Sequence, residues 1–403
     1  MIQQKATAFC GYRKKSILIL ISHYLPGNKI GGPLTSIINI IDHLGSKYDF
    51  NIITYNNDLG ISKPYEGVPV NSWIKDGNVQ IMYLPSHLQS IKSVVREIIN
   101  VNPDFLYLPS LFSPLFSILI IILHKIKIFN VKCIIVATKG ELYDEALNFK
   151  KNKKRLFLFF AKRFNLYKEI IFHASTEFEK QSIMKHIKTT SSKVRIATNL
   201  SSKTSKEFEI CSSSDIMRNY DVINIVFLSR ISKDKNLPFV FDVLKKVKRK
   251  LILRIYGPIE DNYIWDICVK KSKKLPSNIE YMYLGEVKRE KVKNILLNND
   301  LLFLPTFAEN FGHVIAESLS VGTPVLISDN TPWKNLSEFG LGWDINLNNM
   351  QEFVDVIESK LVQNNIYDQK EARRIRIKAF NALNDTEKIF IDHLKLFSKP
   401  NIG

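Results

Sequence analysis

The chain has 403 residues, of which 45% are hydrophobic and 24% charged, and its formal net charge at pH 7 is +18. This length and composition are those of a globular protein with two domains, and they exclude an intrinsically disordered chain. The positive charge suits an anionic membrane surface, anionic substrates or nucleic acid, and a general bias towards lysine explains it equally well.

Neither a membrane span nor a cysteine framework is predicted. The longest apolar stretch, around Leu111–Leu123, is interrupted by polar residues and is shorter than the roughly 20 residues that a span needs. It is typical of a buried helix. The cysteines match no zinc or redox spacing: Cys10, Cys133, Cys211 and Cys268. No convincing signal peptide precedes the first strand, so we expect a reduced, cytoplasmic chain.

The first half of the chain alternates strand-length apolar runs with helical or turn-rich spacers. The first run predicts a buried strand over Ser16–Ser22, and a helix follows it. Further strands are predicted at Phe50–Thr54, Val79–Tyr83, Phe105–Leu108 and Cys133–Ala137, and one more ends near His173. This alternation predicts a Rossmann-like domain, with a parallel sheet and helices on both faces.

Three positions in this half are candidate site residues. Gly31 and Gly32 lie at a helix start, where twin glycines permit close approach of a ligand to the backbone. The third glycine of the dinucleotide fingerprint is missing, and a glycine pair is more often just a turn. Lys139 follows a strand directly, at the edge where ligands bind. His173 is a tempting base, but a histidine inside a strand is more often a packed residue.

The stretch Lys150–Ile171 is the densest in basic and aromatic residues. Five apolar residues are expected roughly on one helical face: Leu156, Phe157, Phe160, Phe164 and Tyr167. This helix would either pack on its domain, with its charges in water, or lie on an anionic membrane leaflet.

Residues 199–221 are rich in Ser, Lys and Glu and predict a linker, after which a second sheet opens at Ile223–Ser229. Arg230 and Lys235 follow that strand at once, where two cations can neutralise a diphosphate. Strands are predicted again at Leu251–Gly257 and Ile279–Leu284, and Met350–Lys399 is expected to be mostly helical.

The stretch Leu301–Ser328 predicts a strand, a polar turn, a helix and a second strand. The helix begins near Gly312, so the free amide groups of Phe311, Gly312, His313 and Val314 favour a phosphate or diphosphate. Because Glu309 and Glu317 are themselves negative, they are better suited to accepting hydrogen bonds from sugar or ribose hydroxyls.

The sequence Glu309-Asn-Phe-Gly-His-Val-Ile-Ala-Glu317, followed by Gly-Thr-Pro-Val at 322–325, resembles the signature of retaining GT-B glycosyltransferases of family 4, the group 1 type. The sequence around Arg230 and Lys235 closely resembles the family's diphosphate-binding pair. The resemblance covers nearly the whole second domain at motif level and the first domain only loosely. Relatives carry a histidine near Lys139, so a catalytic role for that lysine departs from the pattern.

The resemblance implies an α/β protein with the GT-B architecture, in which two Rossmann-like domains with parallel sheets face a central cleft. We expect an acceptor-side domain over residues 1–205 and a nucleotide-sugar domain over 206–384. A last helix over 385–403 is expected to cross back to the first domain.

The resemblance also implies roles for the candidate residues. Arg230 and Lys235 hold the diphosphate of a UDP- or GDP-sugar, Glu317 accepts bonds from the ribose, and Glu309 addresses the donor sugar. Gly31 and Gly32 face the diphosphate across the cleft. The acceptor is expected to be a glycan or a lipid-linked saccharide of a bacterial surface polysaccharide, meaning capsule, O-antigen or lipopolysaccharide.

No Asp-x-Asp pair occurs in the chain, and Arg230 and Lys235 can supply the positive charge of a metal ion, so we expect neither a metal nor another cofactor. A glycosidase, a nucleotide-sugar epimerase of the same architecture and a basic nucleic-acid-binding protein are the rival interpretations. No nucleic-acid-binding module is visible. The expected location is cytoplasmic, with a peripheral position on the inner face of the membrane if Lys150–Ile171 binds it.

Overall fold

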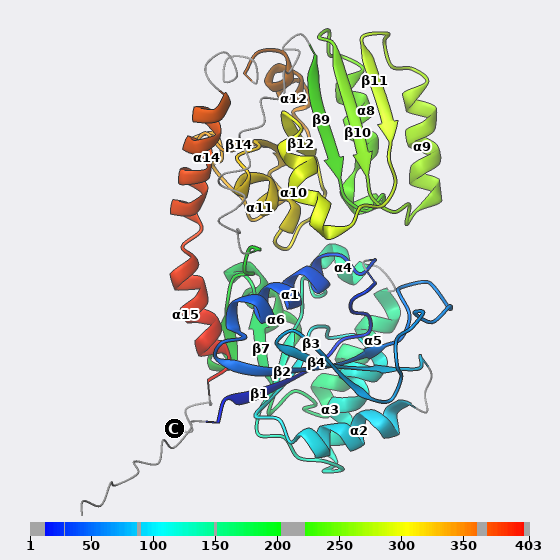
Figure 1. Ribbon diagram of the computed structural model, residues 1–403, viewed down its shortest axis with the longest axis vertical. Helices are drawn as coiled ribbons and strands as arrows, with labels where there is room; N and C mark the ends of the chain where they lie inside the picture. The colour runs from blue at the N-terminus through cyan, green and yellow to red at the C-terminus, as the bar shows by residue number, and fades with distance from the viewer. Residues whose placement is uncertain are drawn as a thin grey trace, which may run out of the picture.

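The computed structural model describes residues 13–27, 29–86, 90–148, 151–202, 222–360 and 369–398. Within them the chain forms two domains, which lie one above the other in Figure 1, each built on its own sheet. The predicted α/β class with two parallel-sheet domains is therefore confirmed. Of the expected linker over 199–221, residues 203–221 lie outside the described part of the chain.

The first domain contains an eight-stranded sheet in the order β3-β4-β2-β1-β5-β6-β7-β8. Its strands are β1 Lys15–Leu20, β2 Tyr48–Tyr55, β3 Trp73–Asp76, β4 Val79–Leu84, β5 Phe105–Leu108, β6 Ile134–Ala137, β7 Ile171–Ala174 and β8 Val194–Ile196. All neighbours pair in parallel except β3 and β4, which are antiparallel at the edge. The loops that follow the parallel strands gather at the sheet edge that faces the second domain.

Helices cover both faces of this sheet, as the alternating pattern predicts. One face packs against α1 (Gly32–Leu44) and the last helix, α15 (Thr386–Leu396). The other face packs against α2 (Ser90–Val101), α3 (Ile120–Lys125), α5 (Lys151–Arg163) and α6 (Glu177–His186). A π-helix over Pro114–Leu119 precedes α3, and the short α4 (Asp144–Asn148) precedes α5.

The second domain has a six-stranded, fully parallel sheet in the order β11-β10-β9-β12-β13-β14. Its strands are β9 Ile223–Leu228, β10 Leu251–Tyr256, β11 Ile279–Tyr283, β12 Leu301–Leu304, β13 Val325–Ser328 and β14 Gly342–Ile345. Around it lie α8 Leu237–Leu244, α9 Asn262–Ser272, α10 Arg289–Leu297, α11 His313–Ser320 and α12 Met350–Asp355, which a π-helix over Val356–Lys360 extends.

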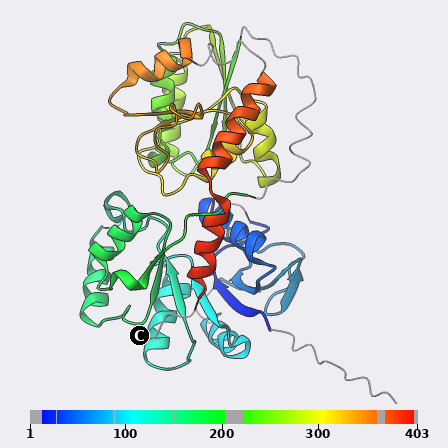
Figure 2. The same cartoon turned by 90° about the vertical axis from the view of Figure 1, so that its left-hand side faces the viewer.

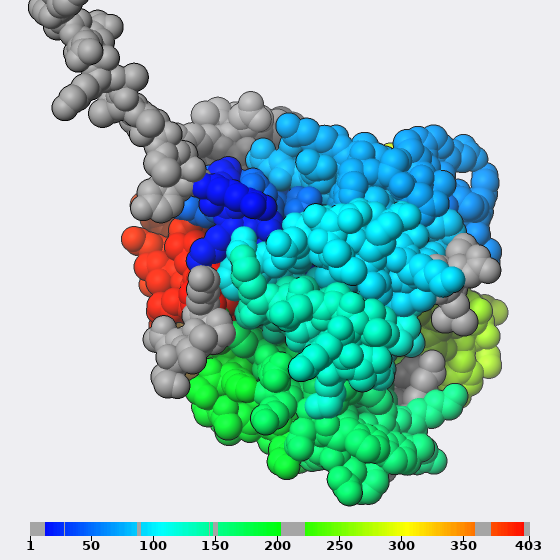
Figure 3. Space-filling model, turned by 90° about the horizontal axis from the view of Figure 1, so that it is seen from below, coloured from blue at the N-terminus to red at the C-terminus, as the bar shows by residue number. Residues whose placement is uncertain are grey.

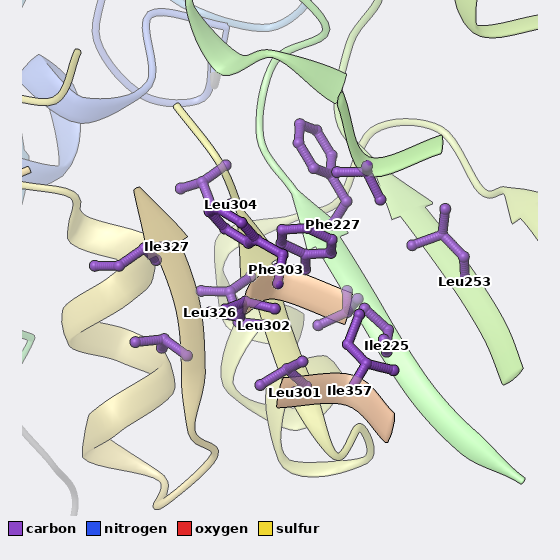
Figure 4. Packing of buried hydrophobic residues seen from close by; sticks show 14 of the residues in the cluster. Ile225, Phe227, Leu253, Leu301, Leu302, Phe303, Leu304, Leu326, Ile327 and Ile357 are labelled. Atoms are coloured by element: carbon purple, nitrogen blue, oxygen red, sulfur yellow. The ribbon is translucent and has the colours of Figure 1, made fainter. Parts of the chain in front are cut away.

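The central strand β12 explains why the sequence of this sheet lacks alternation. All four of its side chains are fully buried, because helices cover both faces of the sheet. Figure 4 shows Phe303 packed between Phe227 and Leu326 of the neighbouring strands. The strand ends at Leu304, so the loop behind it reaches the upper rim of the space between the domains.

The C-terminal helices run alongside both domains, as Figures 1 and 2 show. α14 (Gln369–Leu383) lies on the second domain, where Arg376 donates to Gly322 O at 2.6 Å. α15 lies on the first domain, and the ring of Phe397 behind it packs against Tyr48, Phe105 and Tyr107. The chain thus returns to the domain in which it began.

The shared apolar face predicted for the basic, aromatic helix is correct only in part. Only Lys151–Arg163 is helical, and Lys150 lies outside the described residues. The buried side comprises Leu158, Ala161 and part of Phe157, whereas Leu156, Phe160 and Phe164 are exposed. The error arose because the helix ends at Arg163, so Phe164 and Tyr167 do not continue its periodicity.

Candidate active site

A cleft of about 1360 Å³ separates the two domains and is lined by both. The first domain contributes the start of α1 and the loop after β6, and the second contributes the loops after β9, β10 and β12 with the start of α11. These are carboxyl ends of parallel strands, where open α/β sheets bind ligands. The cleft contains every candidate site residue that the sequence indicated, except His173.

Lys235 lies at the centre of the second-domain wall. Its ammonium nitrogen is 2.8 Å from Glu309 Oε2 and 3.3 Å from Asp234 Oδ2, and its side chain is only 10% exposed. Burial lowers the pKa of Lys235, but the carboxylates of Glu309 and Asp234 outweigh burial and raise it above its ordinary value. Lys235 is therefore a permanently charged cation whose position two carboxylates fix.

The loops that carry Lys235 and Glu309 are bonded to each other through one carbonyl. Asp234 O accepts hydrogen bonds from Phe307 N and Thr306 Oγ1, each at 2.8 Å. Both loops follow neighbouring strands, β9 and β12, so the parallel pairing of the sheet sets their separation. The ion pair is thus held by backbone contacts rather than by the two side chains alone.

Arg230 lies at the rim of the same wall and already has an anionic partner. Its Nη1 is 2.9 Å from Glu260 Oε1 and 2.7 Å from Glu260 Oε2. Both side chains are more than one third exposed, so water screens the pair. A diphosphate in the cleft would compete with Glu260 for this guanidinium.

Gly312 begins α11 in a left-handed conformation with φ of 77°. A Cβ at this position would lie 2.7 Å from Ile315 Cδ1 and 3.2 Å from Glu309 Cγ, so only glycine fits. The turn presents the first amides of the helix to the cleft, from Phe311 to Val314. Phe311 O accepts from Trp333 Nε1 at 2.5 Å, which gives Trp333 a packing role beneath the loop.

Glu317 lies one turn into α11 and is partly buried. Burial raises the pKa of this carboxyl to about 7, although the charges of Arg289 and Lys293 work in the opposite direction. His313, at the first turn of the same helix, has its pKa lowered to about 3 by burial and by the charges of Lys139 and Arg289. At neutral pH the ring of His313 is therefore uncharged.

The glycine pair faces this helix from the other domain. Gly31 has φ of 67° and caps α1, and a Cβ built on Gly32 would come within 3.7 Å of His313 Cδ2. The starts of α1 and α11 therefore oppose each other across the cleft. An anion between them would face the amide ends of two helices.

Lys139 lies on the same first-domain wall as the glycine pair. Its Nζ donates to Ser36 Oγ at 2.7 Å and to Asn199 Oδ1 at 3.0 Å. Burial lowers the pKa of Lys139 to about 8, and the charge of Glu179 raises it by less. His173, in contrast, is part of the core. Its Nδ1 accepts from Tyr107 Oη and its Nε2 donates to Ala197 O, both at 2.8 Å, so it cannot reach a substrate.

Two features of the cleft were missed by sequence reasoning. Tyr143 Oη donates to Asn310 Oδ1 at 2.7 Å, a contact between the two domains next to Glu309. Glu179 is buried, and its carboxylate accepts from Thr138 Oγ1, Gly140 N, Ser175 N and Ser175 Oγ, at 2.6–2.7 Å. It thereby joins the loops after β6 and β7. Thr176 caps α6 by accepting from Glu179 N at 3.1 Å, and nothing in the sequence indicates that this first-turn glutamate points inward.

Within the described part of the chain, no helix is long and apolar enough to cross a membrane. The described residues also contain no group of three or more histidine, cysteine, aspartate or glutamate side chains that could hold a metal ion.

Residues 216–381, which span most of the second domain, match the family described as "Glycosyl transferases group 1". The second domain is therefore similar to the group 1 glycosyl transferases. The whole chain is 22% identical over 284 residues to an uncharacterized 41.2 kDa protein in the cps region of Klebsiella pneumoniae, and the match covers 69% of this chain and 75% of that protein. It is 27% identical over 108 residues to an uncharacterized glycosyltransferase of Methanocaldococcus jannaschii, a match that spans only 26% of either protein.

Solved glycosyltransferase structures are similar to nearly the whole chain, not to the second domain alone. HepE of Anabaena in complex with UDP-glucose has a TM-score of 0.65 at 14% identity and covers 94% of this chain and 99% of its own. WaaG, a glycosyltransferase involved in lipopolysaccharide biosynthesis, has a TM-score of 0.63 at 14% identity and covers 96% and 100%. The chain therefore has the GT-B architecture that the sequence predicted, and its second domain matches the group 1 glycosyl transferase family.

Proposed function

We propose that the chain is a retaining glycosyltransferase that moves a hexose-type sugar from a nucleoside diphosphate donor, UDP- or GDP-linked, to a glycan or lipid-linked acceptor. The observation that carries this proposal is the pairing of Lys235 with Glu309 beside the start of α11, with Arg230 at the rim. Cations and helix amides suit a diphosphate, and carboxylates suit sugar hydroxyls. One wall of the cleft holds both.

In this proposal the second domain binds the donor. Arg230 and Lys235 hold the diphosphate, Glu317 accepts hydrogen bonds from the ribose, and Glu309 together with the amides of Phe311–Val314 orients the sugar. The bond between the anomeric carbon and the phosphate oxygen breaks, and the acceptor hydroxyl forms the new bond on the same face. The hydroxyl proton leaves with the diphosphate. Catalysis is positioning together with stabilisation of the leaving-group charge.

We further propose that no metal ion or other cofactor is needed, because Arg230 and Lys235 supply the positive charge at the leaving group. Chelator treatment is the test. Activity that a chelator abolishes and manganese restores would contradict this part of the proposal.

The pathway proposed is bacterial surface polysaccharide biosynthesis: capsule, O-antigen or lipopolysaccharide. Support comes from the names of two similar proteins, since the Klebsiella pneumoniae relative lies in a cps region and WaaG is involved in lipopolysaccharide biosynthesis.

The first experiment scans binding and hydrolysis of UDP-, GDP- and ADP-hexoses. Wild-type protein is compared with Glu317→Ala and Arg230→Ala, and with Lys185→Ala, which does not line the cleft, as a control. We expect one nucleotide class to bind, with affinity at least tenfold lower in the two site variants and unchanged in the control. Binding of none of the three classes would remove the transferase proposal and favour the nucleic-acid-binding one.

We also propose a peripheral position on an anionic membrane. Leu156, Phe159 and Phe160 are 47–63% exposed on the side of α5 opposite its buried seam. Ile122, Ile126 and Ile128 are exposed at the end of α3, and Lys125 Nζ joins the two regions by donating to Asn165 O at 2.9 Å. Figure 3 shows these segments side by side, in cyan and teal, on the underside of the first domain.

Exposed cations accompany these apolar residues, among them Lys153, Arg155 and Lys162. Because each basic residue near an anionic leaflet contributes about 1 kcal/mol, replacing these three with glutamine should lower vesicle binding about 100-fold. The control replaces Lys245, Lys246 and Lys250 of the second domain, which are equally exposed. Equal binding of both triple variants to phosphatidylserine vesicles would rule out this surface as the membrane contact.

A further inference from the structure

Lys139 is a partly buried cation whose hydrogen-bond partners are neutral. Its Nζ contacts Ser36 Oγ and Asn199 Oδ1, and both partner residues are at most 3% exposed. Among the described residues, the contacts of this nitrogen are a hydroxyl and an amide oxygen, and none is an ion pair with a carboxylate. The charge of Glu179 raises the pKa of Lys139 without a direct contact between the two side chains. The carboxylate of Glu179 instead accepts four hydrogen bonds from the neighbouring loops.

The backbone at Lys139 is also unusual. Its φ is 47°, in the left-handed region that lysine rarely adopts, and Gly140 follows with φ of 78°. Glu179 holds this conformation by accepting from Gly140 N at 2.7 Å. Backbone strain of this kind is concentrated at functional sites, where the surrounding structure enforces it. Here it directs a lysine side chain towards the first turn of α1.

A second cation approaches the same corner of the cleft from the other domain. Arg289 Nη2 donates to Asn39 Oδ1 at 2.6 Å, again a neutral partner, and Asn39 lies one turn beyond Ser36 on α1. The charges of Lys139 and Arg289 both act on His313, which lies opposite Gly32. The corner formed by Gly32, Lys139 and His313 is therefore positive on both walls.

We propose that Lys139 forms a second anion site in the cleft, which binds a carboxylate or phosphate group carried by one of the two sugars. The diphosphate already has Lys235 and Arg230 on the opposite wall, so Lys139 is left for another anion. Partial burial of a lysine without an opposite charge is costly, and an anionic ligand in the cleft would relieve that cost. The inference rests on the proposed function, because it concerns the sugars held in the same cleft.

Two sources of the anion are distinguished by one calorimetric design. In the donor arm, UDP-glucuronate is compared with UDP-glucose. In the acceptor arm, protein saturated with UDP is titrated with glucose 6-phosphate and with glucose. Each arm uses wild-type protein, Lys139→Gln, the charge-preserving Lys139→Arg, and the control Lys185→Gln. Lys185 lies in the same domain but pairs with Asp144 outside the cleft.

We expect wild-type protein to bind the anionic compound at least tenfold more tightly than its neutral counterpart in one arm. Lys139→Gln should bring that ratio close to one, Lys139→Arg should keep part of it, and Lys185→Gln should leave it unchanged. A preference in the donor arm means an acidic donor sugar, and one in the acceptor arm means a phosphorylated acceptor. A wild-type ratio near one in both arms, or a ratio that survives in Lys139→Gln, would overturn the inference.

The preference for the anionic compound over its neutral counterpart should also fall as pH rises above about 8. Burial lowers the pKa of Lys139 to about 8, so the lysine loses its proton in this range. The other groups that face it are Glu179, His173, His313 and His393. Burial holds the pKa of each histidine below its ordinary value, so none changes charge in this window. If no nucleotide binds at all, the proposed function fails, and glucuronate and inorganic phosphate alone, compared between wild type and Lys139→Gln, decide the inference.

Discussion

Replacing Lys235 with methionine should separate the stability of the second domain from its function. Methionine keeps the length of the side chain and removes its charge, so Glu309 and Asp234 lose their partner. Lys235 is 10% and Glu309 17% exposed, so little water can compensate for that loss. Removing one member of a fully buried pair costs about 3–5 kcal/mol, and the residual exposure reduces this to about 2–4 kcal/mol.

For a domain of this size, about 3 kcal/mol corresponds to a fall in Tm of roughly 6–12 °C. The double variant Lys235→Met with Glu309→Gln should recover most of that loss, since the amide removes the buried unpaired charge and Asp234, whose side chain is 45% exposed, is hydrated. Sugar transfer should recover in neither variant, because Lys235 is also the proposed cation for the diphosphate. Nucleotide affinity should fall at least tenfold in both.

Calorimetric melting and nucleotide titration of the wild type, both single variants and the double variant complete the cycle. The pKa of Lys235 is raised in the folded state, so its stabilising effect is fully present below pH 10 and is lost only as pH rises through that raised pKa. The cycle should therefore be measured at pH 7–8. A coupling energy below about 0.5 kcal/mol, or unchanged nucleotide affinity in Lys235→Met, would refute the reasoning.

Three further predictions concern other parts of the molecule. Burial raises the pKa of Glu317 to about 7, so the folded state keeps a proton that the unfolded state releases near pH 4. The free energy of unfolding should therefore decrease as pH rises from 4 to 7. Denaturant titrations of Glu317→Gln at several pH values should show that the contribution of Glu317 to this decrease has disappeared. Tyr143→Phe removes the hydrogen bond to Asn310, worth about 1 kcal/mol, so transfer should slow about fivefold with nucleotide affinity unchanged; a loss of nucleotide affinity instead would count against a role in joining the domains. Phe397→Ala should destabilise the first domain by about 3–5 kcal/mol, because this 1% exposed ring packs between the rings of Tyr48, Phe105 and Tyr107. The control is Lys395→Ala at a neighbouring exposed residue, which should cost less than 1 kcal/mol.

The sequence predicted the central strands best, because burial on both faces gives an uninterrupted apolar run. Phe105–Leu108 has the predicted bounds, and Leu301–Leu304 is the strand predicted at the start of Leu301–Ser328. It did not predict β3, the antiparallel edge strand Trp73–Asp76, since an edge strand that is half exposed has neither a long apolar run nor a clear alternation. The apolar face expected over Leu156–Tyr167 was only partly right, because α5 ends at Arg163 and Tyr167 lies beyond it.

The residues that the second domain contributes to the cleft could be predicted from the sequence motif and from their positions directly after strands. Arg230, Lys235, Glu309 and Glu317 all line the cleft. The sequence could not predict the contacts between the domains. Neither Tyr143 nor Asn310 belongs to a sequence motif, and whether they meet depends on how the two sheets are oriented. Glu260 was also missed. Its ion pair with Arg230 lies within the second domain and depends on the path of the loop after β10.

The position of Phe397 has a consequence for the order in which the protein is made. The strands of the first domain leave the ribosome first, and α1 can cover part of one face of their sheet, but the rest of that face is covered only when residues up to Phe397 have been synthesised. Until then the rings of Tyr48, Phe105 and Tyr107 lack the ring of Phe397 as a packing partner, and the second domain can fold in the meantime. The domain that emerges first is therefore the last to be completed, and a nascent chain is at greatest risk of aggregation during that interval.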